Sequence, residues 1–111
     1  MYKRPSELLI ADILESIEKI ESYTLNISFE NFKNDSKTVD AVVRNLEIIG
    51  EASNRLPEDF KEKYSRIEWI KIIGLRHRIV HEYFGVDVDI IWNIIQKELI
   101  DLKKDIKSVQ F

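Results

Sequence analysis

The sequence predicts an all-α protein, folded as an up-and-down four-helix bundle with one short additional helix or turn. Only three glycines and two prolines occur among 111 residues, which leaves few places for turns. Apolar residues recur at three- and four-residue spacing through four segments, as expected when each helix buries one face. No stretch of strand length alternates apolar and polar residues, so nothing in the pattern favours a sheet.

The first helix is expected over residues 5–24. Pro5 fits in the first turn because it has no N–H to lose there. The buried stripe of this helix is expected to be Leu9, Ile13, Ile17 and Ile20. A polar connection over 26–36 follows, and Ser36 at its end is the expected N-cap of the next helix.

The second helix is expected over 37–56, where Pro57 closes it. Gly50 lies inside this helix at a cost in helix propensity, which indicates a close packing contact at that position. The apolar stripe of the second helix comprises Val39, Val42, Val43, Leu46, Ile49 and Ala52.

A short turn or helix over 58–64 precedes the third long helix, which is expected over 66–84. Ser65 and Glu68 have the spacing of a capping box, in which two side chains satisfy N–H groups at a helix start. Gly85 is the expected terminator because it takes the left-handed conformation at low cost.

Asp87 is the expected N-cap of the last helix, over 88–109. The apolar stripe of this helix comprises Ile91, Ile94, Ile95, Leu99, Leu102 and Ile106. Trp69, Trp92 and Phe84 are interpreted as core or interface aromatics, and the lysines of the last helix as a solvated face.

Length and composition indicate one globular domain over residues 1–111. The chain has no cysteine, which excludes disulfides and thiolate metal sites. A reducing cytoplasm is therefore the expected location. The N-terminus lacks the pattern of a signal peptide, and no apolar run approaches the roughly 20 residues that span a bilayer, so no membrane association is expected.

The net charge of −3 is unevenly distributed. The segment 65–81 contains four basic residues and one acidic residue, so it carries +3 and leaves −6 on the rest of the chain. These charged residues are Arg66, Glu68, Lys71, Arg76 and Arg78. A small basic patch on an acidic body suits a compact phosphate-binding site and does not suit a long nucleic-acid track.

Arg76 and His81 are the candidate catalytic residues. Histidine exchanges protons near neutral pH, and arginine offers paired donors to phosphate, so the two could cleave RNA without a metal. On a regular helix they would lie about 140° apart, flanking one face. Two copies meeting across a two-fold axis would then bring them into one cleft, where Gly74 would permit close approach.

Two other interpretations fit the same residues. An arginine and a histidine on a polar helix face are, from composition alone, more often a solvated surface. His77 and His81 have the i, i+4 spacing of two metal ligands, but the His-Glu-x-x-His form and a third ligand are lacking, so no metal is predicted.

The segment from Arg76 to Tyr83 fits an R-x4-H-x-Y motif, which resembles that of the HepT-type toxins with the HEPN fold. The flanking Gly74-Leu75 and the stretch Phe84-Gly85-Val86-Asp87 also resemble this family. So does the second-helix sequence AVVRNLEIIGEA over residues 41–52. The likeness extends over nearly the whole chain, and His77 departs from it, since the wider family often has Asn or another polar residue there.

The resemblance implies a homodimer with an active cleft at the interface, where Arg76 and His81 cleave RNA without metal or cofactor. It also implies a partner antitoxin, a minimal nucleotidyltransferase (MNT) that blocks the site by transferring AMP to Tyr83. His77, Arg44, Glu47 and Glu51 are candidates for lining or bracing the cleft, although Glu47 could equally be only a salt-bridge partner. The alternative function is a non-catalytic HEPN subunit that binds a nucleotidyltransferase.

Overall fold

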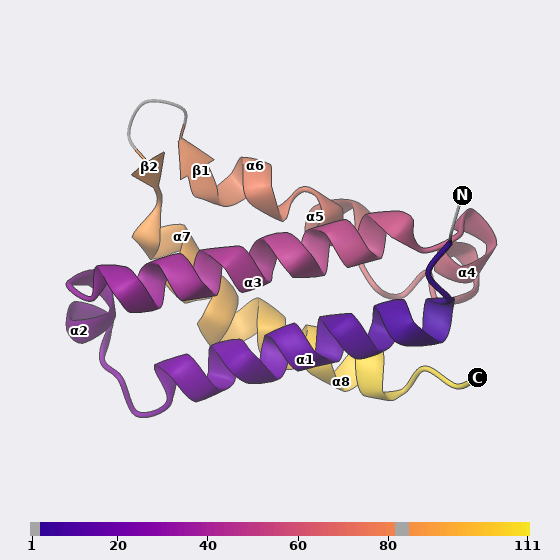
Figure 1. The fold of residues 1–111 in the computed structure, drawn as a ribbon, viewed down its shortest axis with the longest axis horizontal. Coiled ribbons are helices and arrows are strands. Elements are labelled where there is room, and N and C mark those ends of the chain that lie inside the picture. Colours follow the sequence, from indigo (N-terminus) through magenta and orange to yellow (C-terminus); the bar gives the residue numbers. More distant parts are fainter. Residues whose placement is uncertain (1–2, 82–84) are drawn as a thin grey trace.

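A computed structural model describes residues 3–81 and 85–111, apart from the side chain of His81. Within these ranges the chain is an all-α helical bundle with one very short antiparallel ladder (Figure 1). The elements that form the bundle are α1 (Ser6–Thr24), α2 (Phe29–Lys33), α3 (Ser36–Arg55), α4 (Glu58–Lys63), α5 (Trp69–Ile73), α6 (Leu75–Ile79), α7 (Val88–Asn93), the π-helical turn η1 (Ile94–Glu98) and α8 (Leu99–Lys107). The ladder consists of β1 (Val80–His81) and β2 (Gly85–Val86).

The first two predicted helices are present with nearly the expected bounds, as α1 and α3. The cap of α3 differs by one residue, because Asp35 rather than Ser36 accepts a hydrogen bond from the Thr38 N–H, at 3.2 Å. The predicted connection also contains a helix of its own, α2, which begins where the Ser28 hydroxyl accepts from the Asn31 N–H.

The predicted continuous third helix over 66–84 is wrong. Its first turn is absent, since α5 begins only at Trp69 and no side-chain capping bond forms at Glu68. The helix then breaks at Gly74, resumes as α6, and ends at Ile79. The β-branched Val80 takes an extended conformation (φ −104°, ψ 124°), which suits its restricted side chain.

The chain turns back beyond this point as a small hairpin. Val80 pairs with Val86 and His81 with Gly85 in the ladder. The Asp87 N–H also donates to the Ile79 carbonyl at 2.8 Å. Gly85 has the predicted left-handed conformation (φ 78°), but it serves the hairpin and not the end of a helix.

The last predicted helix begins as expected, with Asp87 accepting from the Ile90 N–H at 3.1 Å. It is interrupted by η1, which separates α7 from α8. Leu99 follows Ile91 by eight positions, which in a regular α-helix exceeds two turns by about 80°. The wider π turn absorbs this offset, so both side chains face the core.

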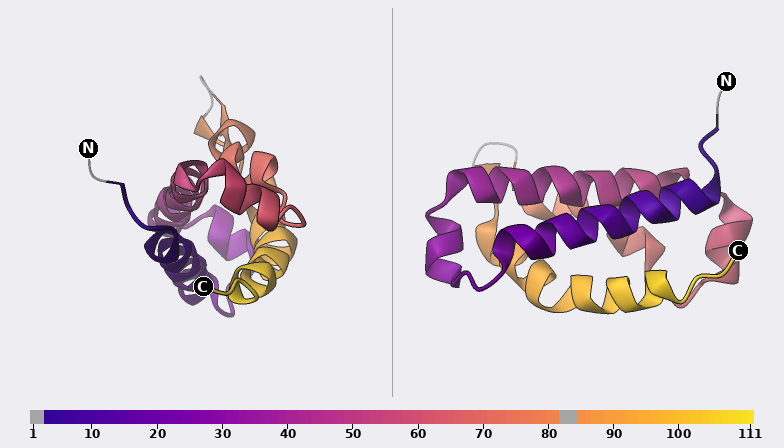
Figure 2. Two further views of the ribbon diagram at one scale, coloured as in Figure 1. Left: turned by 90° about the vertical axis from the view of Figure 1, so that its right-hand side faces the viewer. Right: turned by 60° about the horizontal axis from the view of Figure 1, so that its bottom comes forward.

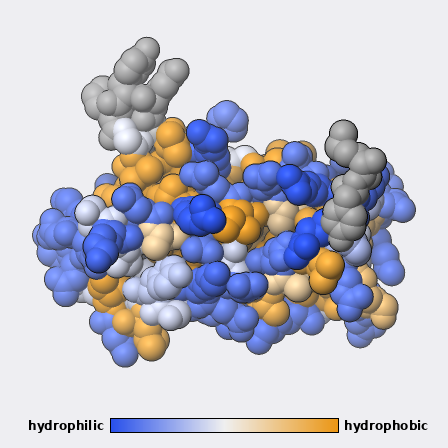
Figure 3. Space-filling view, viewed as in Figure 1, coloured by the Kyte–Doolittle hydropathy of each residue, from blue (hydrophilic) through white to orange (hydrophobic). Residues whose placement is uncertain are grey.

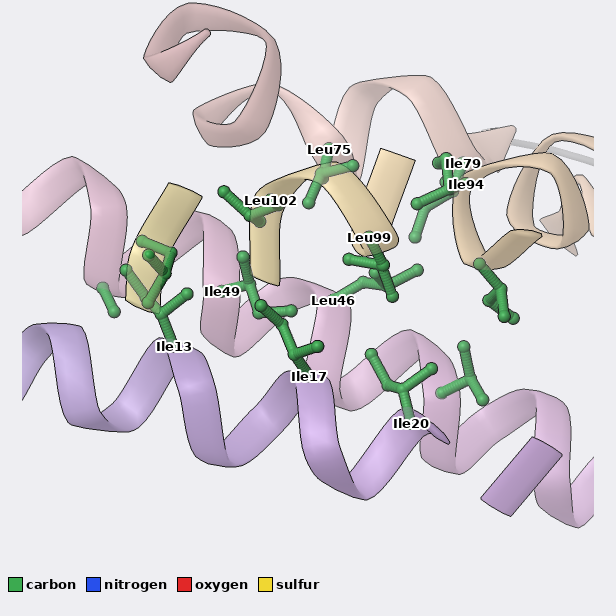
Figure 4. Packing of buried hydrophobic residues seen from close by; sticks show 14 of the residues in the cluster. Ile13, Ile17, Ile20, Leu46, Ile49, Leu75, Ile79, Ile94, Leu99 and Leu102 are labelled. Atoms are coloured by element: carbon green, nitrogen blue, oxygen red, sulfur yellow. The ribbon is translucent and has the colours of Figure 1, made fainter. Parts of the chain in front are cut away.

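Four helical segments surround one apolar core. Seen end-on in Figure 2, α1, α3, the α5–α6 segment and α8 are arranged around its centre. Figure 4 shows side chains from α1, α3, α6 and the last helix pointing toward one another. The predicted stripes supply most of this core, with Val43 only partly buried. No helix in the described ranges is long and apolar enough to cross a membrane.

Candidate functional site

An open groove of about 340 Å³ lies between α3 and the α5–α6 segment. Four of the predicted site residues border it, although they come from two separate parts of the sequence. The lining residues are Leu46, Glu47, Gly50, Glu51, Asn54, Arg55, Ile73, Arg76 and His77. Figure 3 shows hydrophilic side chains, interspersed with apolar ones, along the line where α3 meets α5 and α6.

Gly50 allows the two walls of the groove to approach each other. A Cβ atom at this position would lie 3.2 Å from the Ile72 carbonyl oxygen and 3.4 Å from that of Ile73. The predicted close contact at Gly50 is therefore confirmed, and it is made with the end of α5. Because α6 follows directly after Gly74, this contact also fixes where Arg76 and His77 lie relative to α3.

Arg76 differs from the other cations of the segment 65–81 in its surroundings. Arg66 lies 3.4 Å from Asp105, Lys71 lies 3.5 Å from Glu98, and Arg78 also pairs with Glu98. Arg76 is exposed on the groove and forms no ion pair with any side chain in the described ranges. The predicted basic patch is thus largely neutralised by the last helix, whereas Arg76 meets no such carboxylate within the described ranges.

Arg78 and Glu98 form a two-pronged ion pair. Nη1 donates to Oε1 at 2.9 Å and Nη2 donates to Oε2 at 2.6 Å, the geometry that suits guanidinium and carboxylate best. These hydrogen bonds lower the pKa of the Glu98 carboxyl and raise that of the Arg78 guanidinium, against the opposing effect of partial burial. Arg78 therefore has a structural partner, although it lies only two residues from Arg76.

The acidic side of the groove belongs to α3. Glu51 pairs with Arg55 at 3.0 Å, one helical turn away. Glu47 is exposed and has no ion-pair partner in the described part of the chain, so the salt-bridge interpretation finds no support there. Arg44 is exposed on the same helix but does not line the groove.

Asn54, Arg55 and Ile73 line the groove but were not among the predicted site residues. Arg55 follows Glu51 by four residues, a spacing that predicts an ion pair on one helix face and could have identified it. Asn54 and Ile73 carry no comparable signal, because only the packing of α5 against α3 brings them to the groove.

His81 lies in β1, and its backbone pairs with Gly85. The prediction that Arg76 and His81 share one regular helix, about 140° apart, is therefore wrong. Tyr83 and Phe84 fall outside the described residues. His77 and His81 likewise occupy different elements, so the helical i, i+4 spacing behind the metal interpretation does not apply. Within the described ranges, no group of three His, Cys, Asp or Glu residues could hold a metal ion.

Comparison with known proteins agrees with the family resemblance. A family model described as "Ribonuclease HepT-like" matches residues 13–109. A protein of Thermococcus cleftensis named "Probable ribonuclease HepT" is 45% identical over 101 residues, covering 91% of this chain and 92% of its own. A Caldanaerobacter subterraneus protein named "Putative RNase" is 45% identical over 97 residues, covering 87% of each chain.

A Methanocaldococcus jannaschii protein, also named "Putative RNase", is 38% identical over 109 residues and covers 98% of this chain and 100% of its own. No solved structure matches the chain. The family match spans most of the bundle, including α3 and the segment that carries Arg76 and His81. The chain belongs to the HepT-like ribonuclease family.

Proposed function

We propose that this protein is the toxin of a HEPN–MNT toxin–antitoxin pair, a metal-independent endoribonuclease of the cytoplasm that consists of one HEPN domain over 1–111. One observation carries the proposal. Arg76 borders a groove and lacks an ion-pair partner in the described ranges, whereas its neighbour Arg78 is bound by Glu98. An exposed, uncompensated arginine beside a groove is suited to an RNA phosphate.

The proposed reaction is an internal transfer at one RNA phosphate. The ribose 2′-OH attacks the adjacent phosphorus, the bond to the 5′-oxygen breaks, and a 2′,3′-cyclic phosphate and a 5′-hydroxyl result. His81 takes the 2′-OH proton or delivers one to the leaving oxygen. Arg76 stabilises the negative charge that develops on the phosphate.

The site is proposed to be completed in a homodimer. The groove between α3 and α6 is open to solvent in the single chain, and an active site that excludes water strengthens electrostatic stabilisation. A two-fold dimer through the α5–α6 segment would place two grooves next to each other. In this arrangement Glu47, Glu51 and His77 would shape the cleft around the substrate.

Cleavage of RNA by the purified protein and by a His81→Ala variant tests the mechanism. The substitution is expected to slow cleavage by roughly 10²–10⁴-fold while RNA binding largely persists. Cleavage should continue in excess EDTA and should fail when the cut site carries a 2′-deoxyribose. Full activity of His81→Ala, or equal cleavage of the deoxy substrate, would contradict the mechanism, and an inactive wild type would favour the non-catalytic subunit.

The antitoxin is proposed to act by transferring AMP to Tyr83. The motif places this tyrosine two residues after His81, so an attached AMP would bring negative charge and bulk to the site. Intact mass measured after co-expression with the MNT protein should show added AMP. Tyr83→Phe should lack that mass, with Tyr64→Phe as the control, and an unchanged mass gain in Tyr83→Phe would show that another residue is the acceptor.

A further inference from the structure

Glu98 contacts both halves of the segment that is broken at Gly74. Its carboxylate accepts two hydrogen bonds from Arg78 of α6, at 2.9 and 2.6 Å, and lies 3.5 Å from the Lys71 ammonium of α5. All three side chains are only partly exposed. One carboxylate of the last helix therefore connects α5 with α6 across the break.

The position of Glu98 depends on the π turn. Glu98 is the last residue of η1, directly before Leu99, which is buried. One extra residue in a helix changes its phase by about 100°. Without the wider turn, Glu98 and the core residues of α8 could not both keep their present directions relative to α7.

Arg76 and Arg78 lie on different sides of α6. Side chains two positions apart in a helix point about 200° away from each other. Arg78 therefore reaches the last helix, while Arg76 borders the groove on α3. The helix has only five residues and is followed at once by β1, which contains His81. A rotation of α6 about its axis would turn Arg76 toward or away from the groove on α3 and shift the start of the hairpin.

We propose that Glu98 is a positioning residue of the ribonuclease site, since its contacts with Arg78 and Lys71 hold α6 at the angle that presents Arg76 to the groove. This inference rests on the proposed ribonuclease function. Glu98 is not among the residues that line the groove, so it acts on the substrate only through α6. Its role differs from that of a general stabilising ion pair because it sets the orientation of one short helix.

The test compares Glu98→Gln with Asp105→Asn in the full chain. Asp105→Asn is the matched control. Asp105 lies on α8, and its substitution breaks the pair with Arg66 without touching α6. Glu98→Gln is expected to lower kcat by about tenfold to a hundredfold, as small misplacements of a reacting group do. It should also shift the Arg76 side-chain NMR signal and speed amide exchange over Leu75–Ile79. Asp105→Asn should change none of these quantities.

A double variant tests whether the effect passes through Arg78. Because the two side chains act as one pair, Arg78→Gln combined with Glu98→Gln should lose no more activity than the worse single variant. If Glu98→Gln fails to fold, Lys71→Gln, which removes only the contact at 3.5 Å, should show a smaller loss in kcat and a smaller change in exchange.

The two proposals can fail separately. A wild-type protein that does not cleave RNA overturns the ribonuclease function, while the Arg76 signal and the exchange of α6 still decide whether Glu98 positions this helix. The positioning role is overturned if Glu98→Gln and Asp105→Asn have the same cleavage rate, the same Arg76 NMR signal and the same amide exchange in α6.

Discussion

At the residue scale, Arg76 and Arg78 have similar side chains and different surroundings. Arg78 is held by two hydrogen bonds to Glu98, and its removal would leave that partly buried carboxylate without its main partner. Arg76 is exposed beside the groove and pairs with no described side chain. We expect the two positions to respond differently to substitution: a change at Arg76 should affect cleavage directly, whereas a change at Arg78 should affect it only through the arrangement of α6.

Arg76→Ala is expected to reduce RNA cleavage by about 10²–10³-fold, the usual effect of removing one stabilising donor from a transition state. Arg76→Lys should recover only part of this loss, because an ammonium group lacks the paired donors of guanidinium. RNA binding should weaken in both variants, measured by fluorescence anisotropy. Arg66→Ala is the matched control, because this arginine pairs with Asp105 and does not line the groove. Equal losses in Arg66→Ala and Arg76→Ala would point to general charge rather than to this site.

At the element scale, the approach of α5 to α3 depends on the missing side chain of Gly50. In Gly50→Ala the new methyl group would meet two backbone carbonyls, which cannot rotate away as a side chain could. Alanine favours the helix by about 1 kcal/mol, while overpacking typically costs about 1–3 kcal/mol. The predicted net effect is a free energy of unfolding about 1 kcal/mol lower, together with a displaced α5–α6 segment and reduced cleavage.

Urea unfolding measures this difference. Asp40→Ala, an exposed change on the same helix, serves as the control and should alter the free energy of unfolding by less than about 0.5 kcal/mol. A Gly50→Ala protein that is more stable than the wild type and cleaves RNA normally would show that α5 yields to the methyl group without consequence.

The helices could be predicted from sequence where one apolar stripe faces one core. This holds for α1 and α3, and for the two ends of the last helix. The segment 66–84 could not be predicted this way, because Trp69, Ile72, Ile73, Leu75 and Ile79 keep a helical spacing through the break. The hairpin is stabilised by the hydrogen bond from the Asp87 N–H to the Ile79 carbonyl and by the pairing of Val80 with Val86. Neither interaction can be seen in the local spacing of apolar residues.

Only part of the candidate site, like only part of the fold, could be predicted from the sequence. The sequence named Arg76 as a catalytic candidate and His77, Glu47 and Glu51 as candidates for cleft support, and the structure brings all four to one groove. Arg44 does not line that groove, and Glu98 gave no signal at all. A carboxylate that acts from the last helix on a segment twenty residues away becomes visible only once the chain is folded.

At the scale of the whole molecule, a chain of 111 residues has a small core and gains from association. The described part of the chain exposes one large apolar side chain on α5, Ile70, which is 91% accessible. It lies on the segment through which the dimer is proposed to form, close to the break at Gly74. A two-fold axis near α5 would bury Ile70 of both copies in one self-complementary contact.

We therefore expect a dimer at micromolar concentration, and we expect Ile70→Asp to convert it to a monomer in light scattering. Two buried carboxylates facing each other would oppose association, whereas an aspartate at this exposed position should leave the folded single chain intact by circular dichroism. Cleavage should fall together with the dimer fraction, because the proposed cleft requires both copies. Ile100→Asp on α8, where the side chain is 60% accessible, is the control and should remain dimeric and active. If Ile70→Asp stays dimeric while Ile100→Asp dissociates, the two-fold contact runs through α8, and each groove must then act within its own chain.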